Sequence, residues 1–310
     1  MSKRLQHGKE RFRQGVVSEL EEIIHVVSDL TKFKQTMLLL FSMYAAFIAA
    51  GGFHYPLSEH LLLWILGYLA VGSTTALNMY FDRDIDALMP RTSSRVLPSG
   101  LVSPSLVFYA SLAVFVASVM LSVRYLNAYF ALAIITGFVF DIGAYTLLLK
   151  RRTPLSIIAG AIAGGAPALG GWAAGHGSIS APGLLFSLLV AAWVPSHIWF
   201  LASYYRDDYR RANVPMLPVV ADPASIGTGI GLGALVMGYV SLGLWLLGVI
   251  SIPVALYGVL AASHIFYLAI RYIDYKGDRE FSFKAFKYVN MHLGMFFTLI
   301  IFEKLLQIIL

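Results

Sequence analysis

Residues 61–86 read LLLWILGYLAVGSTTALNMYFDRDID. The first twenty of them carry no charged side chain, which is the length and composition of a helix that crosses a bilayer core of about 30 Å. Asn78 lies at the end of this apolar run, and Asp82 and Asp86 follow it at intervals of four residues. If the helix continues, the three side chains share one face. The stretch therefore predicts a membrane-spanning helix that ends in a row of oxygen ligands.

The composition of the whole chain is that of a membrane protein. Of its 310 residues, 58% are hydrophobic and 13% are charged, whereas a soluble domain is nearer half apolar and a quarter charged. These values exclude a soluble enzyme, a disordered chain, a collagen and a coiled coil. The absence of cysteine excludes a disulfide framework, a thiolate metal site and a cysteine nucleophile. No nucleic-acid partner is expected, because the net charge of +6 is not gathered on a water-exposed domain.

Nine apolar runs are long enough to cross the membrane. They lie near 35–53, 61–80, 104–123, 125–149, 154–174, 182–205, 224–248, 252–270 and 288–310. The sequence thus predicts an all-α fold, a multi-pass bundle of nine transmembrane helices in the lipid bilayer of the cell (plasma) membrane. Residues 35–310 are expected to form its single domain.

The basic residues set the orientation of this bundle. If all nine runs cross the membrane, 21 of the 23 lysines and arginines fall on one side of it, and only Arg124 and Lys304 fall on the other. Loops rich in lysine and arginine stay in the cytoplasm. The N-terminus and the loop after residue 80 are therefore predicted to be cytoplasmic.

Residues 1–34 are too charged for a signal peptide. Apolar residues recur at helical spacing among acidic ones, from Val16 and Val17 through Leu20, Ile23 and Ile24. This pattern indicates a cytoplasmic, interfacial amphipathic segment. A solvated tail is the alternative.

The acidic residues predict a metal site. Two carboxylates four residues apart repel each other unless a cation lies between them, and Mg²⁺ prefers a few carboxylates together with phosphate oxygens. A second pair, Asp207 and Asp208, follows the sixth span on the same predicted side. We therefore expect Asp82, Asp86, Asp207 and Asp208 to bind Mg²⁺, with Asn78 beside them. The alternative is a set of solvated acids at helix ends.

Arginines and lysines beside these acids are the expected partners of a diphosphate. They are Arg91, Arg95, Lys150, Arg151 and Arg206. The positive-inside rule explains any single one of them as well. A diphosphate whose organic part lies in lipid is a prenyl diphosphate, and metal and arginine would stabilise it as it leaves the allylic carbon. Trp199 belongs to a set of aromatic side chains expected to shield the carbocation.

Several motifs resemble the UbiA superfamily of intramembrane prenyltransferases, and within it the heme O synthase (protoheme IX farnesyltransferase) group. They are NMYFDRDIDALMPRT, RVLPSG, YTLLLKRRTPLSI, GGWAA and HIWFLASYYRDDYRRANVPMLPVV. The resemblance extends over nearly the whole chain from residue 30 and implies a nine-helix fold, Mg²⁺, farnesyl diphosphate and heme b. It implies the transfer of a farnesyl group to a porphyrin vinyl group, and the active site would face the cytoplasm. It also gives the metal–diphosphate role to the acids named above, and diphosphate binding to Lys150 and Arg151.

Two polar residues inside the apolar runs are expected near the acceptor. His197 lies about 15 Å deeper along its helix than Asp207, and a neutral imidazole is a good axial ligand for heme iron. A hydrogen bond between helices is the alternative role for His197. Asp141 is expected to border the acceptor pocket and to help place the water that completes the reaction. Two rival functions remain, which are prenylation of a quinone precursor or lipid, and carriage of heme or lipid without catalysis.

Overall fold

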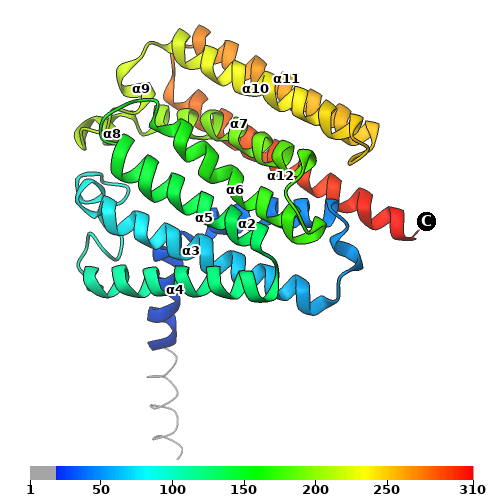
Figure 1. Ribbon diagram of the computed structural model, residues 1–310. Coiled ribbons are helices and arrows are strands. Elements are labelled where there is room, and N and C mark those ends of the chain that lie inside the picture. The colour runs from blue at the N-terminus through cyan, green and yellow to red at the C-terminus, as the bar shows by residue number, and fades with distance from the viewer. Residues whose placement is uncertain (1–18, 310) are drawn as a thin grey trace, which may run out of the picture.

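All nine apolar runs form helices in the computed structural model, which describes residues 19–309. The helices are α2 (Phe33–Ala49), η1 (Gly52–His54), α3 (Leu57–Leu88), α4 (Pro104–Tyr125), α5 (Ala128–Phe138), η2 (Val139–Leu149), α6 (Ser156–His176), α7 (Ala181–Tyr204), α8 (Arg206–Arg211), α9 (Leu217–Val220), α10 (Pro223–Leu246), α11 (Ile252–Asp274) and α12 (Arg279–Ile309). Figure 1 shows the long helices running side by side as one bundle.

Eight helical segments are long and apolar enough to cross a membrane, with α5 and η2 together forming one of them. The ninth expected span corresponds to α2, which has 17 residues and is shorter than the other eight. The all-helical membrane bundle is therefore confirmed for the described residues. The ninth crossing stays a prediction.

Two helices extend well beyond their apolar runs. The α3 helix continues to Leu88, eight residues past the expected end of its span, and α12 begins at Arg279, nine residues before its expected start. The apolar runs mark only the part of each helix that is expected to cross the membrane. A helix keeps its backbone hydrogen bonds when it passes from hydrocarbon into the polar headgroup zone, so charged residues can continue it.

Glycines let the backbone of α6 lie close against the neighbouring helices. A Cβ atom on Gly171 would overlap the backbone carbonyl of Met43 in α2, and one on Gly165 would overlap the carbonyl of Ser187 in α7. Close backbone approach through small residues is the usual way in which helices associate in lipid. This packing holds α2, α6 and α7 together behind the acidic end of α3.

One end of the bundle gathers the connections that carry polar residues. Figure 1 places α8, α9 and the loop that joins α3 to α4 at this end. Ile85 near the end of α3 and Met89 just after it share a buried apolar cluster with Ala202 of α7 and with Ala212 and Val214 of the chain after α7. The two acidic segments therefore belong to the same end of the molecule.

Residues 19–30 form a helix that leaves this bundle, and Figure 1 shows it running nearly perpendicular to the long helices. Its last turns are anchored, because Val26 and Leu30 pack beside Val96, and the Val96 amide donates to Asp29 Oδ2 at 2.8 Å. Leu20, Ile23, Ile24 and Val27 are exposed. An apolar stripe perpendicular to the spans fits the predicted interfacial helix. Val16, Val17 and the basic residues before them lie outside the described residues.

The second half of the fourth predicted span is a π-helix rather than an α-helix. Residues Val139–Leu149 form η2, and the amide of Lys150 donates to the carbonyl of Tyr145 at 2.8 Å. Such i→i+5 turns are rare and are frequently found at functional sites. The hydrophobic pattern of this run contains no sign of the change in helix type.

Candidate functional site

The acidic face of α3 is buried. Asn78, Asp82 and Asp86 lie on one continuous helix and have exposed fractions of 6%, 3% and 4%. The predicted shared face is therefore present. The alternative of solvated acids at a helix end does not hold for Asp82 and Asp86, because α3 continues past them and other elements cover them.

Two of the predicted diphosphate-binding cations pair with this face. Lys150, which follows η2, forms an ion pair with Asp82, and Arg95 of the α3–α4 loop lies 2.8 Å from Asp86. Burial disfavours the charged form of Lys150, but the Asp82 carboxylate outweighs this effect and raises the pKa of the ammonium above its usual value. Each buried carboxylate thus has its own positive partner.

One oxygen of this face has no protein partner. Asp82 Oδ1 is buried and accepts no hydrogen bond from any described residue. A buried carboxylate oxygen without a hydrogen bond destabilises the fold unless a cation or a water molecule binds to it. Together with the amide oxygen of Asn78 and the carboxylate of Asp86, it is a donor set that suits Mg²⁺. The residues present therefore fit the predicted metal.

Arg151 lies apart from the buried acids. Its guanidinium binds both oxygens of Asp84 at 2.6 Å and the carbonyl of Phe81 at 2.9 Å. Asp84 is on the opposite, exposed side of α3, where 61% of its side chain is accessible. This bidentate pair ties the end of η2 to α3, which is a different position from that expected for a direct diphosphate ligand.

The second acidic pair lies on a separate short helix. The α7 helix ends at Tyr204, and Asp207 and Asp208 belong to α8. Asp207 binds Arg279 of α12 and lies 3.1 Å from Arg210. The hydrogen bond from Arg279 is the main reason why the pKa of Asp207 lies below its usual value.

A surface cavity of about 540 Å³ lies between the second acidic pair and the loop that follows α3. Asp208, Asp207 and Arg279 line one part of it, and Pro90 and Arg91 of the α3–α4 loop line another. Arg91 stacks over the ring of Tyr205, with its guanidinium carbon 4.6 Å from the ring centroid. The predicted cation Arg91 thus meets the second acidic pair rather than the first.

The four predicted metal ligands do not form one cluster. Among the described residues, no group of three or more acidic or histidine side chains is close enough to hold a metal ion. Asp82 and Asp86 pair with Lys150 and Arg95, whereas Asp207 pairs with Arg279 and Arg210. Two half-sites at one end of the bundle replace the single convergent site that the sequence suggested. In the second half-site, Arg206 has a buried Nε without a hydrogen-bond partner among the described residues.

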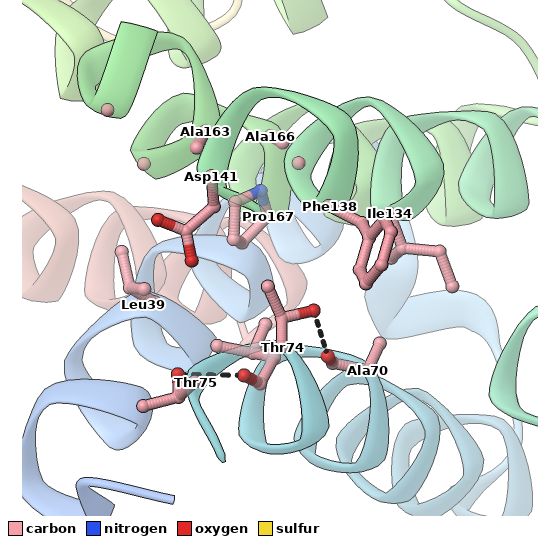
Figure 2. A pocket seen from close by; sticks show the side chains of 14 residues that line it. Leu39, Ala70, Thr74, Thr75, Ile134, Phe138, Asp141, Ala163, Ala166 and Pro167 are labelled. Carbon is pink, nitrogen blue, oxygen red and sulfur yellow. Dashed lines mark hydrogen bonds between the residues drawn. The ribbon is translucent and has the colours of Figure 1, made fainter. Parts of the chain in front are cut away.

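Asp141 lines a separate cavity of about 170 Å³ below the acidic face. Figure 2 shows its side chain turned toward Thr74 and Thr75 of α3, with Pro167 of α6 beside it. The remaining walls are mostly apolar and small, including Ala70 and Gly164. The cavity is therefore an apolar space with one carboxylate at its edge.

His197 and Trp199 line neither this cavity nor the one at Asp208. His197 Nδ1 lies 2.8 Å from the amide oxygen of Asn290 in α12, and the ring lies between Trp193 and Phe286. Trp199 is 5% exposed and packs against Gly229 of α10. The structure does not bring the three predicted acceptor residues together. Asp141 lies on η2, and the turns of α7 direct His197 toward α12 and Trp199 toward α10.

Two polar residues of the site were missed by sequence reasoning. Lys32 Nζ donates to Asn78 Oδ1 at 3.0 Å, and Thr146 Oγ1 accepts from Asn78 Nδ2 at 2.8 Å. Burial, with the positive charge of Arg95, lowers the pKa of Lys32 to about 8. Its position just before the first apolar run was used only for orientation. A threonine in an apolar run carries no sequence signal.

Comparisons with known proteins cover most of the chain. The profile of the UbiA prenyltransferase family matches residues 38–298. A protoheme IX farnesyltransferase of Hyperthermus butylicus is 57% identical over 295 residues, which are 95% of this chain and 99% of the relative. A protoheme IX farnesyltransferase of Archaeoglobus fulgidus is 35% identical over 90% of this chain and 98% of its own length.

Solved structures share the fold at lower identity. A structure from work on a digeranylgeranylglyceryl phosphate synthase superposes with a TM-score of 0.72 at 15% identity, over 91% of this chain and 99% of the other. A UbiA homologue from Archaeoglobus fulgidus, solved with GPP and Mg²⁺, has a TM-score of 0.60 at 16% identity, over 89% and 99%. At such identities the likeness concerns the helical arrangement alone.

Proposed function

Since this chain belongs to the UbiA prenyltransferase family, we propose that it transfers the farnesyl group of farnesyl diphosphate to a vinyl group of heme b (protoheme IX) and so makes heme O. The observation that carries this proposal is the 57% identity to a protoheme IX farnesyltransferase across 99% of that relative's length. The match spans 95% of this chain, so it extends over the region of the predicted acceptor residues as well as over that of the diphosphate motifs.

The buried face of α3 is the proposed diphosphate site. Asn78, Asp82 and Asp86 would hold Mg²⁺ there, and Asp207 and Asp208 would hold it at the second half-site. A related fold has been solved with GPP and Mg²⁺, which supports this assignment. Bound Mg²⁺ supplies positive charge that stabilises the departing diphosphate.

The cations around these acids would bind the remaining diphosphate oxygens. Lys150 and Arg95 are held at the first half-site by Asp82 and Asp86, while Arg91 lies beside the second. Arg206 belongs to the same end of the bundle. We assign Arg151 a supporting role, because both of its terminal nitrogens are committed to Asp84 and Phe81.

The cavity at Asp141 is the proposed place of reaction with the acceptor. Its apolar walls would keep water from the allylic cation while the porphyrin vinyl group attacks. Asp141 is the one acid on those walls, and we propose that it positions the water that adds afterwards. Iron ligation by His197 would have to use Nε2, since Nδ1 faces Asn290. Trp199 packs against Gly229 of α10 and does not line this cavity, so we propose only a packing role for it.

Incubation of the purified protein with heme b, farnesyl diphosphate and Mg²⁺ tests the function. Chromatography of the extracted hemes is expected to show a more hydrophobic product that requires all three components. If a prenylated product formed with a quinone precursor or a glycerol lipid instead of heme, the acceptor would be that compound and not heme b. Binding of heme without any prenylated product would favour a carrier.

We also propose that the acidic end of the bundle faces the cytoplasm of the cell membrane, and that α2 completes nine crossings. The chain has no cysteine, so single cysteines report orientation without background. Ser58 and Ser93 are exposed and lie at the start of α3 and just after its end. In intact spheroplasts, a membrane-impermeant maleimide is expected to label Ser58→Cys but to label Ser93→Cys only after permeabilisation. The reverse pattern would place the active site outside.

A further inference from the structure

Thr146 links the acidic face of α3 to the π-helix η2. Lys32 Nζ donates to Asn78 Oδ1 at 3.0 Å, and Asn78 Nδ2 donates to Thr146 Oγ1 at 2.8 Å. The Thr146 hydroxyl then donates to the backbone carbonyl of Asp141 at 2.7 Å. Asn78 and Thr146 are 6% and 3% exposed, so water is not an available replacement for either partner.

The chemistry of the two ends of this chain allows only one direction of hydrogen bonding. An ammonium can only donate and a carbonyl can only accept. The Asn78 amide must therefore turn its oxygen to Lys32 and its nitrogen to Thr146. A flipped amide would set its NH₂ group against the ammonium of Lys32 and leave the Thr146 lone pair without a donor.

This orientation turns the only metal-binding atom of Asn78 toward the charged centre of the site. Lys32, which contacts this oxygen, lines one surface cavity together with Arg95, and Arg95 pairs with Asp86. The Asn78 oxygen that contacts Lys32 therefore faces the same group of charges. An amide nitrogen in this place would repel a metal ion rather than bind it.

The π-helix is the reason that Thr146 can act in this way. A helical threonine hydroxyl usually donates to the carbonyl three or four residues earlier, and Thr136 of α5 does so to Leu132. Thr146 instead donates five residues back, to Asp141, because the turns of η2 are wider. Its proton is thus engaged by its own backbone, and its lone pair is left for the amide of Asn78.

We infer that Thr146 is a positioning residue of the diphosphate site, which holds the Asn78 amide with its oxygen toward the metal, and that the π-helical backbone of η2 sets the hydroxyl in place. The inference rests on the proposed function, because it assigns the Asn78 oxygen to the Mg²⁺–diphosphate site. It extends that site to a residue that touches neither metal nor diphosphate.

The test compares Thr146→Val, which removes the hydroxyl and keeps the shape, with Thr146→Ser, which keeps the hydroxyl. The readout is Mg²⁺-dependent binding of farnesyl thiodiphosphate, a slowly ionising analogue, measured by calorimetry. Thr146→Val is expected to weaken this binding about 10- to 100-fold, the usual loss when a residue that orients a metal ligand is removed. Thr146→Ser is expected to bind like the wild type. Thr136→Val is the matched control, because its hydroxyl contacts only its own helix.

A double-variant comparison separates positioning from general loss of structure. If Thr146 acts through Asn78, adding Thr146→Val to Asn78→Ala should cause no further loss of binding. Additive losses, or equal losses in Thr146→Ser and Thr146→Val, would overturn the inference, and Thr146→Ala gives the same comparison should valine disturb the helix. A wild-type protein that does not bind the analogue would overturn the inference together with the diphosphate site. Binding of the analogue without any prenylated heme would overturn only the choice of acceptor.

Discussion

Replacing both members of the buried ion pair, in the variant Asp82→Asn with Lys150→Met, is expected to lower turnover by at least about 100- to 1,000-fold while the protein stays folded. Asp82 provides a buried carboxylate oxygen on the acidic face that has no hydrogen-bond partner among the described residues. Its loss removes negative charge where the metal is needed, and the loss of Lys150 removes a cation from the diphosphate. Heme O formation and thermal unfolding in detergent are the two measurements.

The double variant is preferable to Asp82→Asn alone because of burial. The side chains of Lys150 and Asp82 are 12% and 4% exposed, so a single substitution leaves one charge buried without a partner, at a cost of about 3–5 kcal/mol. Low activity in the single variant would therefore be confounded with unfolding. Asp274→Asn is the control, since its carboxylate is half exposed and pairs with Arg271 away from the site. Wild-type turnover in the double variant would show that the acidic face of α3 is not the diphosphate site.

Gly171→Ala is expected to be the most destabilising single-methyl change in α6. Its Cβ would overlap the carbonyl oxygen of Met43, and this is backbone, which cannot turn aside as a side chain can. The two helices would have to move apart. We therefore expect the free energy of unfolding to fall by about 3 kcal/mol, the upper end of the usual range for overpacking. The measurement is the midpoint of thermal unfolding in detergent, together with the yield of monodisperse protein.

Gly294→Ala is the matched control for this substitution. Gly294 also lies inside a long helix, α12, but a Cβ atom there has no neighbour within 4 Å among the described residues. Alanine is a better helix former than glycine by about 0.5–1 kcal/mol, so this variant should unfold at the same temperature as the wild type or slightly above it. Equal midpoints for the two variants would mean that α2 and α6 are not in close backbone contact.

The membrane-bundle class and the acidic face of α3 could be predicted from the sequence because both depend on local pattern. Apolar length decides whether a helix is stable in lipid, and a spacing of four residues places Asn78, Asp82 and Asp86 on one side of any helix that continues. The structure shows that the helix does continue, to Leu88. The likeness of the motifs to the UbiA family was a further consequence of sequence alone.

Burial, pairing and the separation of the two half-sites were decided only by tertiary structure. Lys150 and Arg151 are adjacent in sequence, yet one meets buried Asp82 and the other meets exposed Asp84, because these acids lie on opposite sides of α3. His197 and Asp141 both looked like acceptor residues, but only Asp141 lines the apolar cavity, since α7 turns His197 toward Asn290 of α12. The partner of a side chain depends on which helix packs against it, and no residue spacing encodes that. The π-helix at Thr146 is the clearest case, because an apolar run has the same composition whether its turns close after four residues or after five.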